Sequence, residues 1–270
     1  LIIFLLCQIP IATTLKPECF KTNDGFFIED DQIDDLLDTK ILHVGGVGLM
    51  NQMNAGRTEE IMAEAKRRGV VTTLDVFAST PDDLPKVACL LPYTDYFLPS
   101  EEEARALSGL QKNRDLAQFL IDRGAGSVIL TLGADGAYYR HRDGTEFHTP
   151  AFKVDVKCTC GCGDAFNAGF AVALRRGLDA EQAVRFAQAT SALNASGLGS
   201  QAGVVDFEGT WSFTEGTPAY TASMAHGDRT TELTLAAAAH EDGAYLGACD
   251  LAEQFLSSWI DELPFGRPLA

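Results

Sequence analysis

The sequence has little positive charge and no long hydrophobic run. Of its 270 residues, 21 are Lys or Arg and 38 are Asp or Glu, so the formal net charge is −17 at pH 7. A chain this acidic repels phosphate backbones and anionic lipid surfaces. We therefore expect no nucleic-acid partner and no membrane partner. Any anionic substrate must be held by a local site, such as a helix N-terminus or a bound cation.

The hydrophobic runs of the sequence also give no candidate for a membrane-spanning segment. The opening run at residues 1–6 is interrupted by Gln8 and Pro10, well short of the roughly 20 residues that a spanning helix needs. It also lacks the basic start and clear cleavage site of a secretory signal. Because the chain begins with Leu, we expect a fragment in which residues 1–15 are a core strand or a badly joined end.

The number and the spacing of the cysteines do not suit a disulfide framework. There are seven, an odd count, and Cys158, Cys160 and Cys162 alternate within five residues, which favours a reducing, cytoplasmic setting. On an extended segment these three side chains would point the same way, which raises the alternative of a metal or redox site. Structural zinc sites usually use wider spacing and a second cluster, whereas Cys249 stands alone. Retained equimolar zinc would support this alternative.

What the sequence does contain is a regular alternation of strands and helices. Hydrophobic residues make up 46% of the chain, enough for a sizeable core. The apolar runs suit strands buried on both faces, which predicts a mostly parallel sheet covered by helices. Thr58 is the expected cap of one helix, and Ser100 with Glu103 has capping-box spacing at the start of another. The expected strands span residues 41–44, 70–74, 96–98, 127–131, 136–140 and 145–148. Besides the helix that begins at Ser100, the expected helices span 58–68, 114–123, 165–176 and 180–193.

Residues 154–169 carry the clearest chemical signal. A strand runs into a Gly-x-Gly turn, and a helix then begins with Asp164 in its first turn. Unpaired amides at such a turn, together with the positive end of the helix dipole, bind a charged oxygen. Asp164 is then either a helix cap or a general base for a hydroxyl that attacks a phosphoryl group held over these amides. Spacing alone leaves both interpretations open.

The same stretch resembles a known family. Gly161–Phe166, followed by Asn167 and Gly169, is similar to the Asp-Thr-Thr-Gly-Ala-Gly-Asp-Ala-Phe signature of the ribokinase-like (PfkB) carbohydrate kinases. Residues 128–137 look like the nucleotide-side strand and turn of that family, and residues 98–104 look like its Asn-x-x-Glu helix start. The resemblance covers residues 35–206 and implies a three-layer α/β/α sandwich with a mostly parallel central sheet.

The resemblance implies an ATP-dependent sugar kinase, a phosphotransferase with an alcohol acceptor, in the cytoplasm. It makes Asp164 the base and gives the amides from Gly161 through Asp164, including those of Cys162 and Gly163, the role of an anion hole. The remaining roles are nucleotide binding by Thr131, Gly133, Gly136 and Gln188, and ordering of Mg²⁺ through water by Glu103. The competing structural interpretations are ordinary ones: turn glycines, a capping acid at Glu103, and a solvent-facing Gln188.

Departures from the family pattern set the limits of this prediction. Cys158 replaces the first signature Asp, so activation by a monovalent cation does not carry over, and Ser100 replaces the usual Asn. The first strand, the sugar-binding Asp and the lid of the family are not recognisable, and residues 1–34 stay unassigned. Residues 207–270 form an extension in which 232–239 and 244–260 have helical patterns. The sequence therefore does not identify the sugar. It also does not decide whether the chain forms a homodimer, which members of the family build through the lid. The alternatives are a nucleoside kinase of this fold and a nucleotide-binding module without a sugar pocket.

Overall fold

The computed structural model describes residues 2–4, 27–47, 53–78 and 80–216. These residues divide into two compact units. The first unit contains the described residues up to Ala151 together with Ala171–Val184. The second contains Phe152–Phe170 and the described residues from Arg185 onward.

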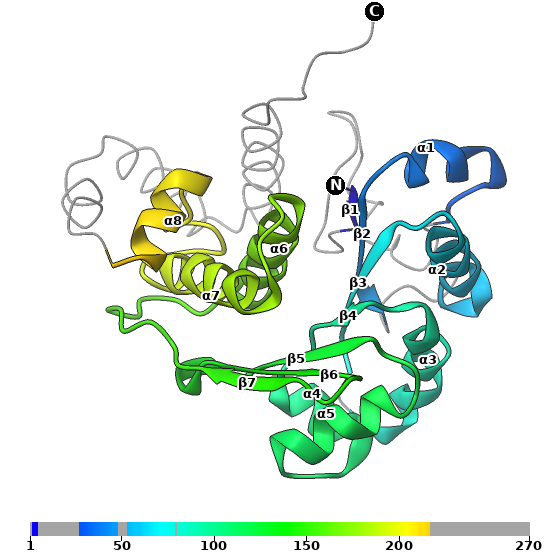
Figure 1. Cartoon of the computed structure of the whole chain (residues 1–270), viewed down its shortest axis with the longest axis horizontal. Coiled ribbons are helices and arrows are strands. Elements are labelled where there is room, and N and C mark those ends of the chain that lie inside the picture. The colour runs from blue at the N-terminus through cyan, green and yellow to red at the C-terminus, as the bar shows by residue number, and fades with distance from the viewer. Residues whose placement is uncertain (1, 5–26, 48–52, 79, 217–270) are drawn as a thin grey trace, which may run out of the picture. The chain divides into compact units, whose positions relative to one another are not determined.

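The first unit is built on a seven-stranded sheet whose spatial order follows the chain (Figure 1). The first five strands are parallel, and the last two add an antiparallel hairpin at one edge. This confirms the mostly parallel sheet expected from the sequence, and β6 and β7 lie at the predicted strands 136–140 and 145–148. The strands are β1 (Ile2–Phe4), β2 (Ile41–Val47), β3 (Val71–Val76), β4 (Tyr96–Phe97), β5 (Ser127–Thr131), β6 (Ala137–His141) and β7 (Glu146–Thr149).

Helices fill the connections between the parallel strands. Contacts join α2 to β3, and join α4 and α5 to β5. The α-helices of these connections are α1 (Ile33–Leu37), α2 (Thr58–Arg67), α3 (Leu84–Ala88), α4 (Glu101–Ser108) and α5 (Asn113–Ile121). Short turns of helix are η3 (Asp30–Gln32), η4 (Met53–Arg57), η5 (Pro81–Asp83), η6 (Leu91–Tyr93) and η7 (Gly133–Asp135).

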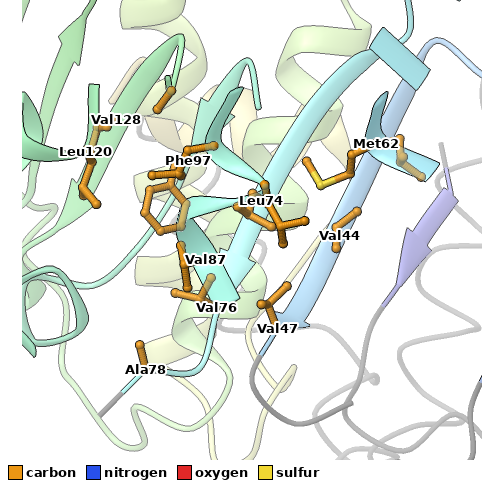
Figure 2. Packing of buried hydrophobic residues seen from close by; sticks show 14 of the residues in the cluster. Val44, Val47, Met62, Leu74, Val76, Ala78, Val87, Phe97, Leu120 and Val128 are labelled. Carbon is orange, nitrogen blue, oxygen red and sulfur yellow. The ribbon is translucent and has the colours of Figure 1, made fainter. Parts of the chain in front are cut away.

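The main core lies where one face of the sheet meets these helices. Leu74 of β3 is opposite Phe97 of β4, which in turn is opposite Val128 of β5, and all three side chains are fully buried. Figure 2 shows this row of side chains with Met62 of α2 and Leu120 of α5 around it. Apolar runs on both faces of the strands were the signal for this arrangement, because a parallel sheet is buried on both sides.

The opposite face of the sheet carries a second, more polar layer. His43 of β2 and Thr73 of β3 are directly opposed, and the distance between Nδ1 of His43 and Oγ1 of Thr73 is 2.8 Å. Farther along, the Ser127 hydroxyl lies 3.0 Å from that of Tyr139. Burial lowers the pKa of His43 to about 4, so this imidazole is neutral in the folded protein at pH 7.

Two predicted boundaries in the first unit are wrong for identifiable reasons. Strand β2 does not end before Gly45 but continues to Val47, with a register shift after Val44 and Gly46 at φ 70°. Such a bulge lets a strand pass through glycines that otherwise signal a turn. Thr58 is not the cap of α2, because η4 precedes it without a break, and its hydroxyl donates to the Met53 carbonyl at 3.0 Å.

Three helices follow the sheet. Helix α6 (Cys162–Arg175) begins three residues before the predicted 165, and α7 (Ala180–Ala195) extends to residue 195 rather than 193. Asp179 caps α7 by accepting from the Gln182 N–H at 2.9 Å. None of the helices in the described ranges is long and apolar enough to cross a membrane.

Helix α8 (Phe207–Thr214) was not predicted. Asp206 caps it by accepting from the Gly209 N–H at 2.7 Å. Within the second unit, Phe207 and Trp211 stack with Phe186 of α7, with ring centroids 4.8 and 6.3 Å away. Tertiary packing of aromatic rings therefore stabilises a segment that has no clear helical period of its own. The helical patterns at 232–239 and 244–260 lie outside the described residues.

Candidate active site

The start of α4 lies at the carboxyl end of β4 and is a complete capping box. The N–H of Glu103 donates to the Ser100 hydroxyl at 3.2 Å, and Oε2 of Glu103 accepts from the Ser100 N–H and hydroxyl, each at 2.8 Å. The Ala78 N–H also donates to this carboxylate. Burial is the largest influence on Glu103 and raises the pKa of its carboxyl. The capping role predicted from spacing is confirmed.

A tight turn follows β5 at the same edge of the sheet. The N–H of Thr131 donates to the Pro99 carbonyl at 3.1 Å, which places the end of β5 beside the start of α4. Gly136 has φ 99°, and a methyl group there would collide with the carbonyl of Thr149. Gly133 has φ 56° and open space where a Cβ would stand. Gly136 therefore closes the turn, while the space beside Gly133 is open.

In the second unit, hydrogen bonds fix the loop before α6 to the last turns of α7. The N–H of Lys157 donates to the Ala195 carbonyl at 2.8 Å. The buried amide of Asn194 donates to the Cys160 carbonyl at 2.9 Å, and the Ser191 hydroxyl donates to the Cys162 carbonyl at the same distance. Sequence patterns did not identify Ser191 or Asn194, because only the fold brings them to this loop. Their i, i+3 spacing on the helix after the signature was the available signal.

Gly161 makes the turn into α6. It has φ 70°, and a Cβ would stand 2.6 Å from the Ser200 carbonyl oxygen. The N–H of Cys162 donates to the Thr159 carbonyl at 3.2 Å, so this member of the expected anion hole already has a partner. Within the described ranges no acceptor contacts the N–H groups of Gly163 and Asp164, and the space beside Gly163 is open. Helix N-termini of this kind attract anions.

Asp164 is the third residue of α6, so it does not occupy the capping position that one sequence interpretation gave it. Its residue is exposed to solvent, and among the residues that the structure describes no donor pairs with its carboxylate. Partial desolvation by the surrounding protein nevertheless raises the pKa of Asp164 above its ordinary value. An accessible carboxylate with a raised pKa beside free amides has the properties of a general base next to an anion site.

Gln188 lies one turn before Ser191 on α7 and is only 5% exposed. The alternative of a solvent-facing residue is therefore wrong. In the same unit, Gly169 lets α6 approach α7 closely, because a Cβ there would stand 2.5 Å from the Thr190 hydroxyl. Gly169, the last glycine of the stretch that resembles the family signature, thus has a packing role.

The residues present fit Mg²⁺ only in a limited way. Across the described ranges, no group of three or more His, Cys, Asp or Glu side chains is arranged to hold a metal ion. Glu103 already accepts several hydrogen bonds, which leaves it suited to water-mediated contact rather than direct ligation. Mg²⁺ typically keeps several waters and binds through substrate phosphates, a mode that one such carboxylate can support.

Comparisons with known proteins show which family the chain resembles. Residues 19–206 match the family described as pfkB family carbohydrate kinase. The deoxyribokinase of Salmonella typhi is 35% identical over 119 residues, which are 42% of this chain and 39% of that protein. The aminoimidazole riboside kinase of Salmonella typhimurium is 42% identical over 98 residues, 36% of this chain and 30% of that protein. The chain thus spans about a third to two fifths of these curated relatives.

Solved structures show the same fold. The ribokinase of Thermotoga maritima has a TM-score of 0.56 and 28% identity, over 68% of this chain and 59% of that one. The Arabidopsis thaliana ribokinase complexed with ribose and ATP has a TM-score of 0.61 and 23% identity, over 70% and 60% of the two chains. A putative ribokinase II from E. coli in complex with ATP and Mg²⁺ has a TM-score of 0.60 and 24% identity, over 68% and 61%. These similarities establish an α/β ribokinase-like fold.

Proposed function

The chain belongs to the pfkB family of carbohydrate kinases, and we propose that it transfers the γ-phosphoryl group of ATP to a sugar hydroxyl with Asp164 as general base. The observation that carries this proposal is the first turn of α6. There an accessible carboxylate with a raised pKa lies next to the free N–H groups of Gly163 and Asp164. The relatives named above act on sugars and ribosides, which supports the same class of acceptor here.

In the proposed reaction, the Asp164 carboxylate accepts the proton of the acceptor hydroxyl as its oxygen attacks the γ-phosphorus. The bond from that phosphorus to the bridging oxygen of ADP breaks, and ADP leaves with the electron pair. The N–H groups of Gly163 and Asp164 stabilise the charge on the transferred group. Gly161 and Cys162 contribute chiefly by holding the turn, since the Cys162 N–H bonds to Thr159.

The nucleotide side of the proposal uses the edge of the sheet. Thr131 and the open turn at Gly133 contact the ATP phosphates and ribose, and Gly136 keeps that turn closed against Thr149. Gln188 faces the adenine. When bound, Mg²⁺ supplies positive charge to the phosphates, and Glu103 orders it through water.

The acceptor has two candidates. A simple sugar is favoured by the similarity to deoxyribokinase and ribokinases, and a nucleoside-like riboside by the 42% identity to aminoimidazole riboside kinase. The chain covers a minority of the length of these relatives. The test therefore includes a third possibility, a module that binds nucleotide without transferring phosphate. We also propose a cytoplasmic location, where ATP is available, and a homodimer that light scattering can test.

An ADP-release assay separates these arms. The full chain is incubated with Mg·ATP and, in parallel, ribose, 2-deoxyribose, fructose 6-phosphate or aminoimidazole riboside. We expect ADP release that depends on the presence of one sugar or riboside. ATP binding without release in any reaction would favour the nucleotide-binding module and contradict the kinase.

A further inference from the structure

Two cysteines in the loop before α6 form a pair that the proposed kinase chemistry does not use. Cys160 is exposed and Cys158 is partly exposed. The N–H of Cys160 donates to Sγ of Cys158 at 3.4 Å. The Cys158 sulfur thus lies against the backbone of a second, exposed cysteine.

The surroundings assign different roles to the two sulfurs. N–H groups of Cys160 and Gly199, followed by the Cys160 thiol, lower the pKa of Cys158. The Cys158 sulfur in turn raises the pKa of Cys160. Cys158 therefore loses its proton more readily than Cys160, and the thiolate is the nucleophile in thiol chemistry.

Other described cysteines lack this arrangement. Sγ of Cys162 donates to the Ser191 carbonyl at 3.6 Å and accepts from the Asn194 amide at 3.4 Å. Burial raises the pKa of Cys89, whose thiol donates to the Lys86 carbonyl at 3.3 Å. Cys162 and Cys89 therefore serve as internal comparisons for the reactive pair.

We propose that Cys158 and Cys160 form a peroxide-sensitive dithiol, a modification site in which Cys158 is oxidised first and Cys160 resolves it. The Cys158 thiolate attacks one oxygen of hydrogen peroxide, the O–O bond breaks, and after protonation the products are a sulfenic acid and water. The Cys160 sulfur then attacks the sulfenic sulfur and a second water leaves. Overall, two thiols lose two electrons and two protons to the peroxide, and one disulfide forms.

This disulfide would alter the turn into α6. A bond across the single residue Thr159 closes a small, strained ring, and strained disulfides are readily reduced and suited to reversible control. The same Thr159 carbonyl accepts from the Cys162 N–H, and the Cys160 carbonyl accepts from Asn194. Oxidation therefore displaces the amides at the start of α6. This consequence rests on the proposed function, because those amides bind the transferred phosphoryl group.

Mass spectrometry tests the dithiol without reference to activity. The reduced full chain is treated with equimolar hydrogen peroxide, alkylated with N-ethylmaleimide and digested with trypsin, which releases residues 158–175 with three cysteines. We expect this peptide to lose two hydrogens and to carry one maleimide, on Cys162, while Cys89 stays fully alkylated. Three alkylated cysteines in the peptide, or a bond that uses Cys162, would overturn the proposal.

Matched variants assign the order of events. In Cys160→Ser we expect a dimedone adduct on Cys158, because the sulfenic acid has no resolving partner. In Cys158→Ser we expect neither the adduct nor the disulfide. Equal dimedone labelling at position 160 in Cys158→Ser would show that the roles are reversed and would contradict the assignment.

Nucleotide binding by the reduced and oxidised chain tests the consequence. We expect oxidation to weaken the Kd for Mg·ATP about tenfold, the effect of losing a hydrogen bond to a charged group, and dithiothreitol to restore it. An unchanged Kd in a chain shown by mass to be oxidised would refute the coupling. If neither form binds Mg·ATP, the proposed function fails, and the disulfide measurement decides the dithiol separately.

Discussion

Gly136 and the carbonyl group of Thr149 are in such close contact that no side chain fits between them. Gly136 also has φ 99°, a backbone conformation that L-residues rarely adopt. We expect Gly136→Ala to destabilise the protein by at least about 3 kcal/mol, because strain and collision add. Gly133→Ala is the matched control: it meets open space at φ 56° and should cost about 1 kcal/mol. Urea unfolding measures both, and equal losses would contradict this account.

The capping box at the start of α4 gives a second stability prediction. Ser100→Ala removes the acceptor for the Glu103 N–H and the hydroxyl that donates to its carboxylate. We expect a loss of about 1 kcal/mol, the usual cost of an N-cap. Ser100→Asn keeps a capping side chain and should stay within about 0.5 kcal/mol of the parent. A parent-like midpoint for Ser100→Ala in chemical denaturation would show that the cap contributes nothing.

His43 predicts how stability depends on pH. Its pKa is lowered to about 4 by burial, whereas an unfolded histidine titrates near 6.5. As pH falls below 6.5, the unfolded chain binds a proton that the folded chain excludes, so stability decreases. His43 lowers the free energy of unfolding by about 3 kcal/mol near pH 4 and does not change it above pH 7. In His43→Gln we expect the free energy of unfolding to fall less steeply between pH 6.5 and pH 4.5 than in the parent. An unchanged slope would show that other titrating groups cause the pH dependence.

The raised pKa of Asp164 predicts the pH dependence of turnover. A general base acts only when deprotonated, so kcat/KM should fall as the pH drops through that pKa. The midpoint should lie above about 3.9, the ordinary value for Asp, at pH values where circular dichroism shows the chain folded. A midpoint at or below the ordinary value would mean that desolvation does not act on the catalytic carboxyl.

Much of the fold follows from local patterns. Strand β5 was predicted residue for residue, because an apolar run between Gly126 and a glycine turn leaves one interpretation. Helix α8 was missed because its stability comes from Phe207 and Trp211 stacking on Phe186, a contact between distant segments. The η4 turn before α2 was missed because no hydrophobic period marks such a turn.

The candidate site was predictable to a similar degree. Asp164 follows a glycine turn at the start of a helix, a pattern that indicates an anion site and its acid from sequence. The strand expected before this turn is not formed, since residues 154–159 lie in neither a strand nor a helix. Ser191 and Asn194 hold the same turn, but their i, i+3 spacing did not identify them, since their role depends on the packing of α7 beside it. The free amides reduce to those of Gly163 and Asp164, because Cys162 bonds to Thr159, a detail that spacing cannot resolve.

The most direct test of the central claim compares Asp164→Asn with Asp115→Asn. Both residues are the third of their helices, α6 and α5, so the control removes an acid from an equivalent position. Mg·ATP binding by calorimetry and acceptor-dependent ADP release are measured on the parent and both variants. We predict similar Kd values in all three, with kcat reduced about 10²- to 10⁴-fold only in Asp164→Asn. Parent-like turnover in Asp164→Asn, or no Mg·ATP binding by the parent, would contradict the account.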